Sequence, residues 1–257
     1  MRIVPALLPK SAKPLEGGRY PFGIASLDAA LGGGLARGRI HEVYAAEGDD
    51  LASAAGFAVG VATGMTDSKG TVLWLRVQRS ARQGGVLQAH GWAELGGAAG
   101  QGLVAVVPDT KALLRAGVDA LRCAALGAVI VEGLGAMREL DLTASRRLAL
   151  AAEKSGVPLL LLRHDATPVP SAAQTRWQVA AAPSHSLPGN APGGPTFDVT
   201  LLRQRSGPCG LDWRLEWDRD RRMFCEAALS GAVVSTPAHR PAADTGGGGC
   251  QNDKRAA

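Results

Sequence analysis

Short apolar runs, separated by segments of helical length, constrain the fold of this chain more than any other feature. The runs are RIHEVY (39–44), TVLWLRV (71–77), LVAVV (103–107), AVIVE (128–132) and VPLLLL (157–162). The last three are almost continuously apolar, which is typical of strands that are buried on both faces. Strands that alternate with helices along a chain usually form a parallel sheet that the helices cover. The sequence therefore predicts an α/β fold.

The segments between these strands have the lengths of ordinary helices. The helices that we expect span residues 50–64, about 81–90, 109–125 and 142–155. Asp141 or Thr143 can cap the start of the last one, and Gly156 can end it in a left-handed turn. After residue 163 the pattern changes, and segments 197–204 and 211–217 indicate an antiparallel hairpin. The expected fold is a parallel or mixed sheet flanked by helices, with this hairpin at its C-terminal end.

The domain organisation follows from length and composition. The chain has 257 residues, of which 46% are hydrophobic and 20% are charged, and this suffices for one sizeable core. Residues 1–20 are expected to form a disordered arm, and the Gly-rich polar segment 236–257 is expected to form a disordered tail. One core domain over residues 21–235 is the prediction.

Cysteine usage and hydropathy argue against several classes of protein. The cysteines form no CxxC pair and lie far apart, so neither a zinc site nor a disulfide framework is indicated; they are Cys123, Cys209, Cys225 and Cys250. No cluster of His, Cys, Asp and Glu has metal-ligand spacing, so no metal is expected. No segment approaches the ~20 apolar residues of a membrane span, and prolines break the apolar run at the N-terminus. A cytoplasmic protein is expected.

The charge of the chain is unevenly distributed. The net charge of +5 permits a polyanionic partner without requiring one. Trp213 and Trp217 share parity along their strand and should point to one side of the sheet, where they either pack on the domain or anchor a partner. Trp177 is expected in the core. The basic residues that surround the tryptophan pair fit either a solvated face or a binding face; they are Arg203, Arg205, Arg214, Arg219, Arg221 and Arg222.

The segment from Ala45 to Ala52 has the position of a phosphate-binding loop but not its chemistry. A Gly-x-x-x-x-Gly-Lys-Ser/Thr loop supplies glycine amides around the phosphates, a lysine on the outer phosphates and a hydroxyl on magnesium. After Gly48 and Asp49, this chain has Asp50 at the second glycine, Leu51 at the lysine and Ala52 at the hydroxyl.

The two carboxylates of this loop, Asp49 and Asp50, lie where an anion would bind. Their repulsion of a triphosphate is on the order of kilocalories per mole for each charge pair, and no lysine offsets it. They can also accept hydrogen bonds from the free amides at the start of the following helix. We therefore expect no nucleotide cofactor and no ATPase activity. Taken alone, the segment is equally explained as an acid-capped helix of an unrelated α/β protein.

A longer run removes that ambiguity. The segment FGIASLDAALGGGLARGRIHEVYAAEG, Phe22 to Gly48, resembles RecA recombinases, in which a Ser-Leu-Asp-x-Ala-Leu-Gly run precedes Gly-Arg-Ile and the phosphate loop. The run AVIVEGLGAM is similar to the strand that carries the magnesium-associated acid in that family, which places Glu132 at this position. Where RecA has a glutamate that activates water, this chain offers Gln78 or Arg76, and Gln78 is no general base. The resemblance implies a RecA-like fold without the catalytic groups.

This combination is similar to the ImuA family of RecA-like accessory proteins, over roughly residues 20 to 226. Supporting runs are TVLWLRVQRSAR, LDLTASRRLALAAEKSGVPLLLLR, TRWQVAAAPS and FDVTLLRQRSGPCGLDWRLEWD. The resemblance implies a part in error-prone translesion synthesis during SOS mutagenesis. The implied partners are ImuB, a polymerase-like protein without catalytic competence, and a C-family error-prone DNA polymerase. RecA is a further candidate, and whether DNA is contacted directly or through a partner stays open.

The resemblance also suggests contact residues. In recombinases the loops after the fourth and fifth strands approach DNA, and the corresponding regions here are 133–142 and 164–176. His164 is better explained as a hydrogen-bonded residue at a strand end. Two other functions stay open, a DNA-dependent ATPase of RecA type and a SulA-like inhibitor of cell division. The candidate contacts with DNA or a partner are Arg163, His164, Arg176, Arg203, Arg205 and Arg214.

Overall fold

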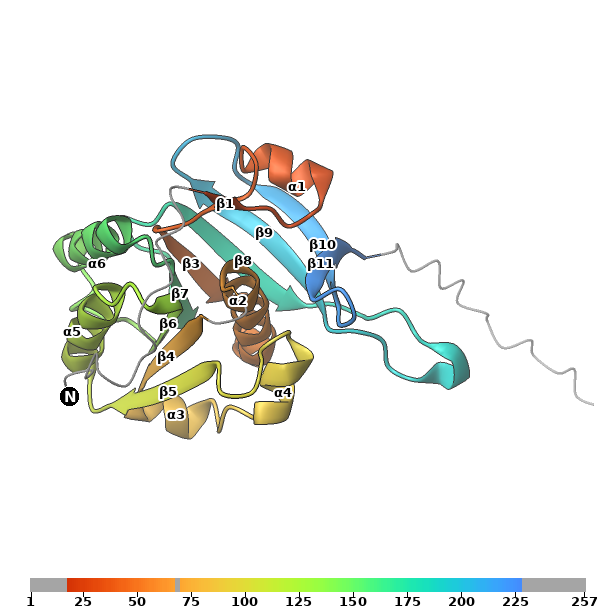
Figure 1. Cartoon of the computed structure of the whole chain (residues 1–257), viewed down its shortest axis with the longest axis horizontal. Coiled ribbons are helices and arrows are strands. Elements are labelled where there is room, and N and C mark those ends of the chain that lie inside the picture. Colours follow the sequence, from red (N-terminus) through yellow and green to blue (C-terminus); the bar gives the residue numbers. More distant parts are fainter. Residues whose placement is uncertain (1–17, 68–69, 228–257) are drawn as a thin grey trace, which may run out of the picture.

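One nine-stranded mixed sheet organises the computed structural model, which describes residues 18–67 and 70–227 (Figure 1). The strand order is β11-β10-β9-β8-β3-β7-β6-β4-β5. The parallel part consists of β3 (Ile40–Ala45), β4 (Thr71–Val77), β5 (Gly102–Val107), β6 (Leu126–Leu134), β7 (Leu159–His164) and β8 (Thr175–Ala181). The antiparallel part continues from β8 through β9 (Thr196–Gln204), β10 (Leu211–Asp218) and β11 (Met223–Glu226). The predicted α/β architecture with a C-terminal antiparallel hairpin is confirmed.

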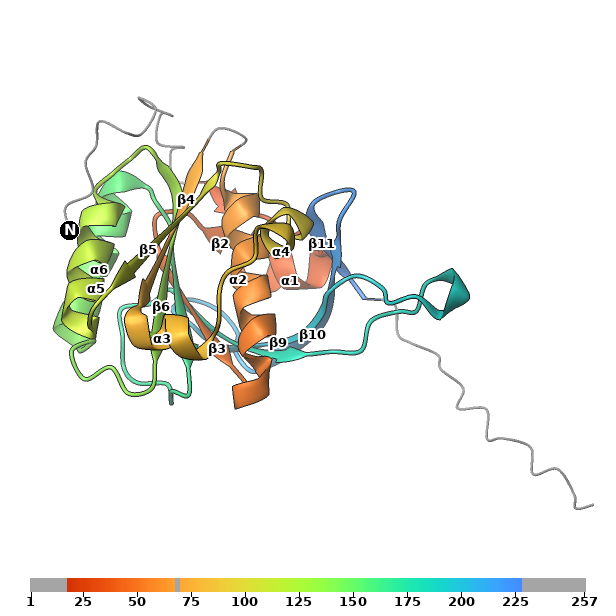
Figure 2. The ribbon, with the colours of Figure 1, turned by 90° about the horizontal axis from the view of Figure 1, so that it is seen from below.

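Helices cover both faces of the sheet. On one face lie α5 (Thr110–Leu121) and α6 (Leu142–Ser155), and on the other lies α2 (Leu51–Met65) (Figure 2). The central strands are buried on both sides: Ala128 and Ile130 of β6 belong to the core under α2, whereas Val129 and Val131 belong to the core under α5 and α6. This two-sided burial is the physical reason for the continuous apolar runs in the sequence.

The boundaries of α6 follow from its caps. The Asp141 carboxylate accepts a hydrogen bond from the amide N–H of Ala144 at 2.7 Å, and Gly156 ends the helix with φ of 78°. Asp141 was one of the two caps that the sequence left open, whereas the terminating Gly156 was predicted and the predicted range 142–155 matches the helix.

The single helix expected over residues 81–90 is wrong. The chain instead forms two short helices, α3 (Gln78–Gln83) and α4 (Ala89–Glu94). Gly84 and Gly85 separate them, and Gly85 adopts φ of 69°, which a helix cannot continue through. As a result, the segment between β4 and β5 contains two short helices instead of one.

The arm expected over residues 1–20 is too long at its C-terminal end. Arg19–Tyr20 forms β1, which pairs with β2 (Leu35–Ala36), next to the short helix α1 (Ala25–Ala30). The Tyr20 ring is buried in the core, and the Arg19 guanidinium donates to the carbonyl oxygens of Leu31 and Gly34. The rest of the predicted arm, and the predicted tail over 236–257, lie outside the described residues.

The aromatic residues of the C-terminal strands pack inward. Trp177 and Trp217 are each 1% exposed, so the core position predicted for Trp177 is confirmed. Trp213 is half-buried, and its indole N–H donates to the Ser26 hydroxyl at 3.1 Å. The question left open by the sequence is therefore answered: the tryptophan pair packs on the domain. Between β8 and β9, the chain extends away from the body of the molecule through a short 3₁₀ turn, Pro188–Asn190 (Figure 1).

Within the described ranges, no helix has the length and hydropathy that a bilayer span requires. The cysteines at 123, 209 and 225 are free thiols.

Candidate functional site

The loop after β3 is held closed by the carboxylate of Asp50, a residue of the loop itself. Gly48–Asp50 forms a 3₁₀ turn that leads directly into α2. The Asp50 carboxylate accepts hydrogen bonds from the Ala181 amide at 2.7 Å and from the Glu47 amide at 3.1 Å. These partners lie in the preceding turn and at the end of β8, and not in the first turn of α2 as the sequence had suggested. The side chain at the second glycine position therefore ties the loop to the sheet.

A buried ion pair occupies the position of the magnesium-associated acid. Arg76 on β4 and Glu132 on β6 are cross-strand neighbours, and their Nη2 and Oε1 atoms lie 2.8 Å apart. Both side chains are almost completely buried, and the Trp74 indole N–H donates to the other carboxylate oxygen at 2.8 Å. A carboxylate whose charge is compensated by a buried guanidinium, and whose other oxygen accepts from an indole, is a poor ligand for a metal ion.

The residues around the loop do not fit a magnesium triphosphate. The cationic, hydroxyl and metal-binding groups that such a ligand needs are replaced by Leu51, Ala52 and an arginine-bound Glu132. Gln78 begins α3 with an exposed side chain. Among residues 18–67 and 70–227, no group of three or more His, Cys, Asp and Glu side chains is arranged to hold a metal.

His164 lies beside this ion pair at the end of β7. Its Nε2 atom is 3.7 Å from Glu132 Oε1, and neither ring nitrogen has a hydrogen-bond partner within the described chain. The interpretation of His164 as a hydrogen-bonded residue is therefore wrong. Burial, and to a lesser degree the positive charges of Arg76 and Arg163, lower the pKa of His164 from 6.5 to about 4.

This lowered pKa predicts a loss of stability in acid. Between pH 6.5 and 4 the unfolded chain binds a proton at His164 that the folded chain does not, so the free energy of unfolding falls as the pH falls. The shift corresponds to about 3 kcal/mol. His41, which is also buried with a pKa lowered to about 4, contributes in the same direction.

The variant His164→Gln is expected to remove about half of this histidine-dependent loss. Urea denaturation of the variant and the unmodified chain at several pH values between 7 and 4 measures the difference. His185→Gln is the matched control, because His185 is exposed. If the two variants show the same pH dependence, the protonation of His164 does not limit stability in acid.

A cavity of about 850 Å³ opens beside the ion pair, between α2, the α3–α4 segment and β5. Its walls include Leu51, Trp74 and Trp92, and its polar lining includes Arg76, Glu132 and His164. Leu103 and Val104 of the edge strand β5 are exposed and also line it. Arg76 and Glu132 in this largely apolar cavity are paired with each other, and Asp49 adds a negative charge, so the cavity suits an apolar group better than a phosphate.

Comparison with known proteins gives the family. The chain is 36% identical over 210 residues to Protein ImuA from two strains of Caulobacter vibrioides, and the match covers 76% of this chain and 82% of each relative. The chain belongs to the ImuA family. No protein-family model matches it. A solved structure that it resembles is the crystal structure of the RadB recombinase, with a TM-score of 0.48, 15% identity, and coverage of 81% of this chain and 100% of that one.

In this ImuA-family chain, three of the residues predicted to contact DNA or a partner are buried. Arg176 Nε lies 2.7 Å from Glu42 Oε2, and Arg163 donates to the Gly135 carbonyl at 3.1 Å. Both guanidinium groups lie 5.7 Å from the centre of the Tyr44 ring. The Arg176 contact connects β8 to β3, the Arg163 contact connects β7 to the residue that follows β6, and His164 is buried beside them. Their burial argues against the predicted contacts with phosphate.

The predicted residues on the C-terminal hairpin lie elsewhere in the ImuA-family fold. Arg214 makes a two-pronged contact with Asp198, with Nε and Nη2 at 2.7 and 2.8 Å from the carboxylate oxygens, so its charge is largely compensated. Arg203 and Arg205 are exposed, and their contact role stays a prediction.

The pairing of Glu42 with Arg176 was missed in the sequence. The sequence feature that could have indicated this pairing is Glu42, a charged residue inside the largely apolar run RIHEVY.

Proposed function

We propose that this chain is a non-catalytic, RecA-like accessory protein of error-prone translesion DNA synthesis in the SOS response. In this proposal it acts through protein–protein contacts with an ImuB-like polymerase-fold protein and a C-family error-prone DNA polymerase, in the cytoplasm. Membership of the ImuA family supports the association with translesion synthesis. The nucleotide-site geometry supports the non-catalytic part.

The observation that carries the proposal is the buried contact between Arg76 and Glu132. In a nucleotide-hydrolysing site of this type, the acid at the tip of this strand is needed for magnesium. Here it is bound to a guanidinium that also donates to the carbonyl oxygens of Ser80 and Gly85. Releasing Glu132 for a metal ion would leave Arg76 buried and unpaired, which is strongly unfavourable. Asp50, Leu51 and Ala52 in the loop also disfavour the binding of a nucleotide.

The proposal predicts that the unmodified chain does not bind ATP. Titration of a fluorescent ATP analogue with magnesium should give no saturable signal at concentrations where a RecA recombinase, used as the positive control, is saturated. Phosphate release in the presence of single-stranded DNA should equal the background without protein. The physical reason is the repulsion between the triphosphate and Asp49 and Asp50, with no lysine to offset it.

A variant with Ala45→Gly, Asp50→Gly, Leu51→Lys and Ala52→Thr provides the comparison, because it returns the loop to the nucleotide-binding pattern. It is expected to bind the analogue at least tenfold more tightly than the unmodified chain. Tight magnesium-dependent binding and turnover by the unmodified chain would instead establish an ATPase and contradict the proposal.

A further inference from the structure

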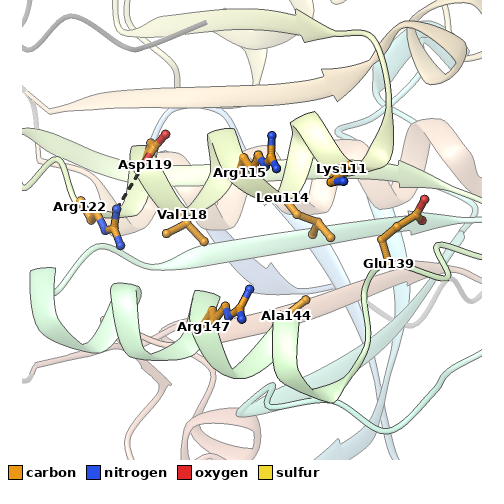
Figure 3. Close-up of a pocket in the computed structure, with 9 residues that line it drawn as sticks. All are labelled: Lys111, Leu114, Arg115, Val118, Asp119, Arg122, Glu139, Ala144 and Arg147. Atoms are coloured by element: carbon orange, nitrogen blue, oxygen red, sulfur yellow. Dashed lines mark hydrogen bonds and ion pairs between the residues drawn. The ribbon is translucent and has the colours of Figure 1, made fainter.

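The outer face of α5 and α6 carries a hollow of about 860 Å³ that lies on the opposite side of the sheet from α2 (Figures 2 and 3). Residues at intervals of three and four along α5 line it, and residues of α6 face them across the hollow. The α5 stripe runs from Lys111 to Arg122, a length of about 16 Å at 1.5 Å per residue. The hollow therefore has the length of about three helical turns.

The floor of this hollow is apolar and its rim is basic. Leu114, Val118 and Ala144 form the apolar floor. The cationic groups at the rim outnumber the acidic groups; the cations are Lys111, Arg115, Arg122 and Arg147, and the acids are Asp119 and Glu139. Arg122 lies 3.4 Å from Asp119, whereas Lys111, Arg115 and Arg147 make no ion pair with another described residue.

The apolar surface continues beyond the rim. A second hollow, of about 420 Å³, lies on the other side of Lys111 and Arg115 and reaches Val106 of β5, which is 49% exposed. On α6, Leu150 is 66% exposed one turn after Arg147. The basic side chains of α5 thus lie between two apolar surfaces, the floor of the first hollow and the second hollow. An amphipathic partner can cover both surfaces and pair with these side chains.

We propose that the α5–α6 hollow binds an acidic, amphipathic helix of the polymerase-fold partner. Apolar side chains of that helix would pack on Leu114, Val118 and Ala144, and its carboxylates would face Lys111, Arg115 and Arg147. A helix that docks in such a groove does so through its own side chains at i, i+3, i+4 and i+7, so the partner helix should carry apolar residues at this spacing. The inference rests on the proposed function, because it names the surface through which that partner binds.

The composition of the hollow favours a protein over a nucleic acid. A phosphate backbone gains little from an apolar floor, and Asp119 and Glu139 would repel it. An acidic helix gains from both features, since its apolar face buries the floor and its carboxylates complement the surplus of cations.

The double charge reversal Arg115→Glu and Arg147→Glu tests this surface. Both side chains are exposed, so the variant is expected to fold, which circular dichroism and a thermal melt would check. The Kd for the purified ImuB-like partner, measured by calorimetry, should rise at least tenfold, and its dependence on salt concentration should become weaker. The alternative surface is tested by Arg203→Glu with Arg205→Glu, which changes the net charge equally on the C-terminal hairpin, where contacts with DNA or a partner are also predicted. If the α5–α6 hollow is the binding surface, only the α5–α6 variant loses affinity for the partner.

The remaining outcomes separate the two proposals. If the unmodified chain binds the partner and the α5–α6 variant binds equally well, or if only the hairpin variant loses binding, the inference is wrong while the proposed function stands. If the α5–α6 variant keeps the partner but loses affinity for a labelled DNA duplex, the hollow is a nucleic-acid surface and the inference is again wrong. If no variant, including the unmodified chain, binds the partner, the proposed function fails and the inference fails with it.

Discussion

Replacing Glu132 with leucine is expected to lower the free energy of unfolding by about 3–5 kcal/mol, because it leaves a buried guanidinium without its partner. The Arg76 side chain is 4% exposed and would keep its bonds to two carbonyl oxygens but lose the only carboxylate within 4 Å among the described residues. The Trp74 indole N–H would also lose its acceptor. Urea denaturation followed by circular dichroism at pH 7 measures the change.

The double variant Arg76→Met with Glu132→Leu separates the buried charge from the loss of packing. Replacing both members of a buried ion pair by apolar residues is often neutral or stabilising, so the double variant should recover most of the stability that Glu132→Leu loses. Asp198→Leu is the surface control. Asp198 pairs with Arg214, and both side chains are about 40% exposed, so its loss should be under about 1 kcal/mol. Similar losses for Glu132→Leu and Asp198→Leu would show that the buried pair has no special structural role.

Most strands of this fold were predictable, because burial on both faces requires a continuous run of apolar residues in the sequence. The range predicted for β4 matches the structure, and the predicted ranges for β3, β5, β6 and β7 differ from it by one or two residues at their ends, whereas β8 was not predicted as a strand. The predicted helix 142–155 also matches, because its N-cap and its terminating glycine are local signals. The segment 81–90 was mispredicted where two adjacent glycines interrupt a helical pattern. Strand order was not predictable, since β8 pairs with β3, more than a hundred residues earlier in the chain.

The chemistry of the site could be predicted only in part, because contacts between residues far apart in the sequence leave no local signal. The replacement of lysine, glycine and hydroxyl in the loop could be read directly at positions 50–52. The partner of Asp50 could not, because the Ala181 amide lies 131 residues away in the sequence. The pairing of Arg76 with Glu132, 56 residues apart, depends on β4 and β6 being neighbours in this register. Arg163, near the end of β7, and Arg176, near the start of β8, were predicted to be contact residues, whereas the structure buries both of them.

The variant Trp217→Ala is expected to lower the free energy of unfolding by about 3–5 kcal/mol, through the loss of apolar burial and the cavity that remains. Trp217 is 1% exposed, and its ring packs edge-on against Phe224 with the ring centres 5.0 Å apart. Its indole N–H donates to the Glu94 carbonyl at 2.9 Å. A Cβ atom added at Gly60 would come within 3.1 Å of this ring, so α2 approaches β10 closely.

Trp213→Ala on the same strand is the matched control for this prediction. Trp213 is half-buried, and its hydrogen bond joins the hydroxyl of Ser26 instead of a main-chain carbonyl, so its replacement should cost less than half as much. Denaturation of both variants under the same conditions gives the comparison. Because Trp217 connects the antiparallel strands to both α2 and α4, its loss should also increase amide hydrogen exchange in α4, which Trp213→Ala should leave unchanged. Equal losses for the two variants, or unchanged exchange in α4, would show that Trp217 does not hold these layers together.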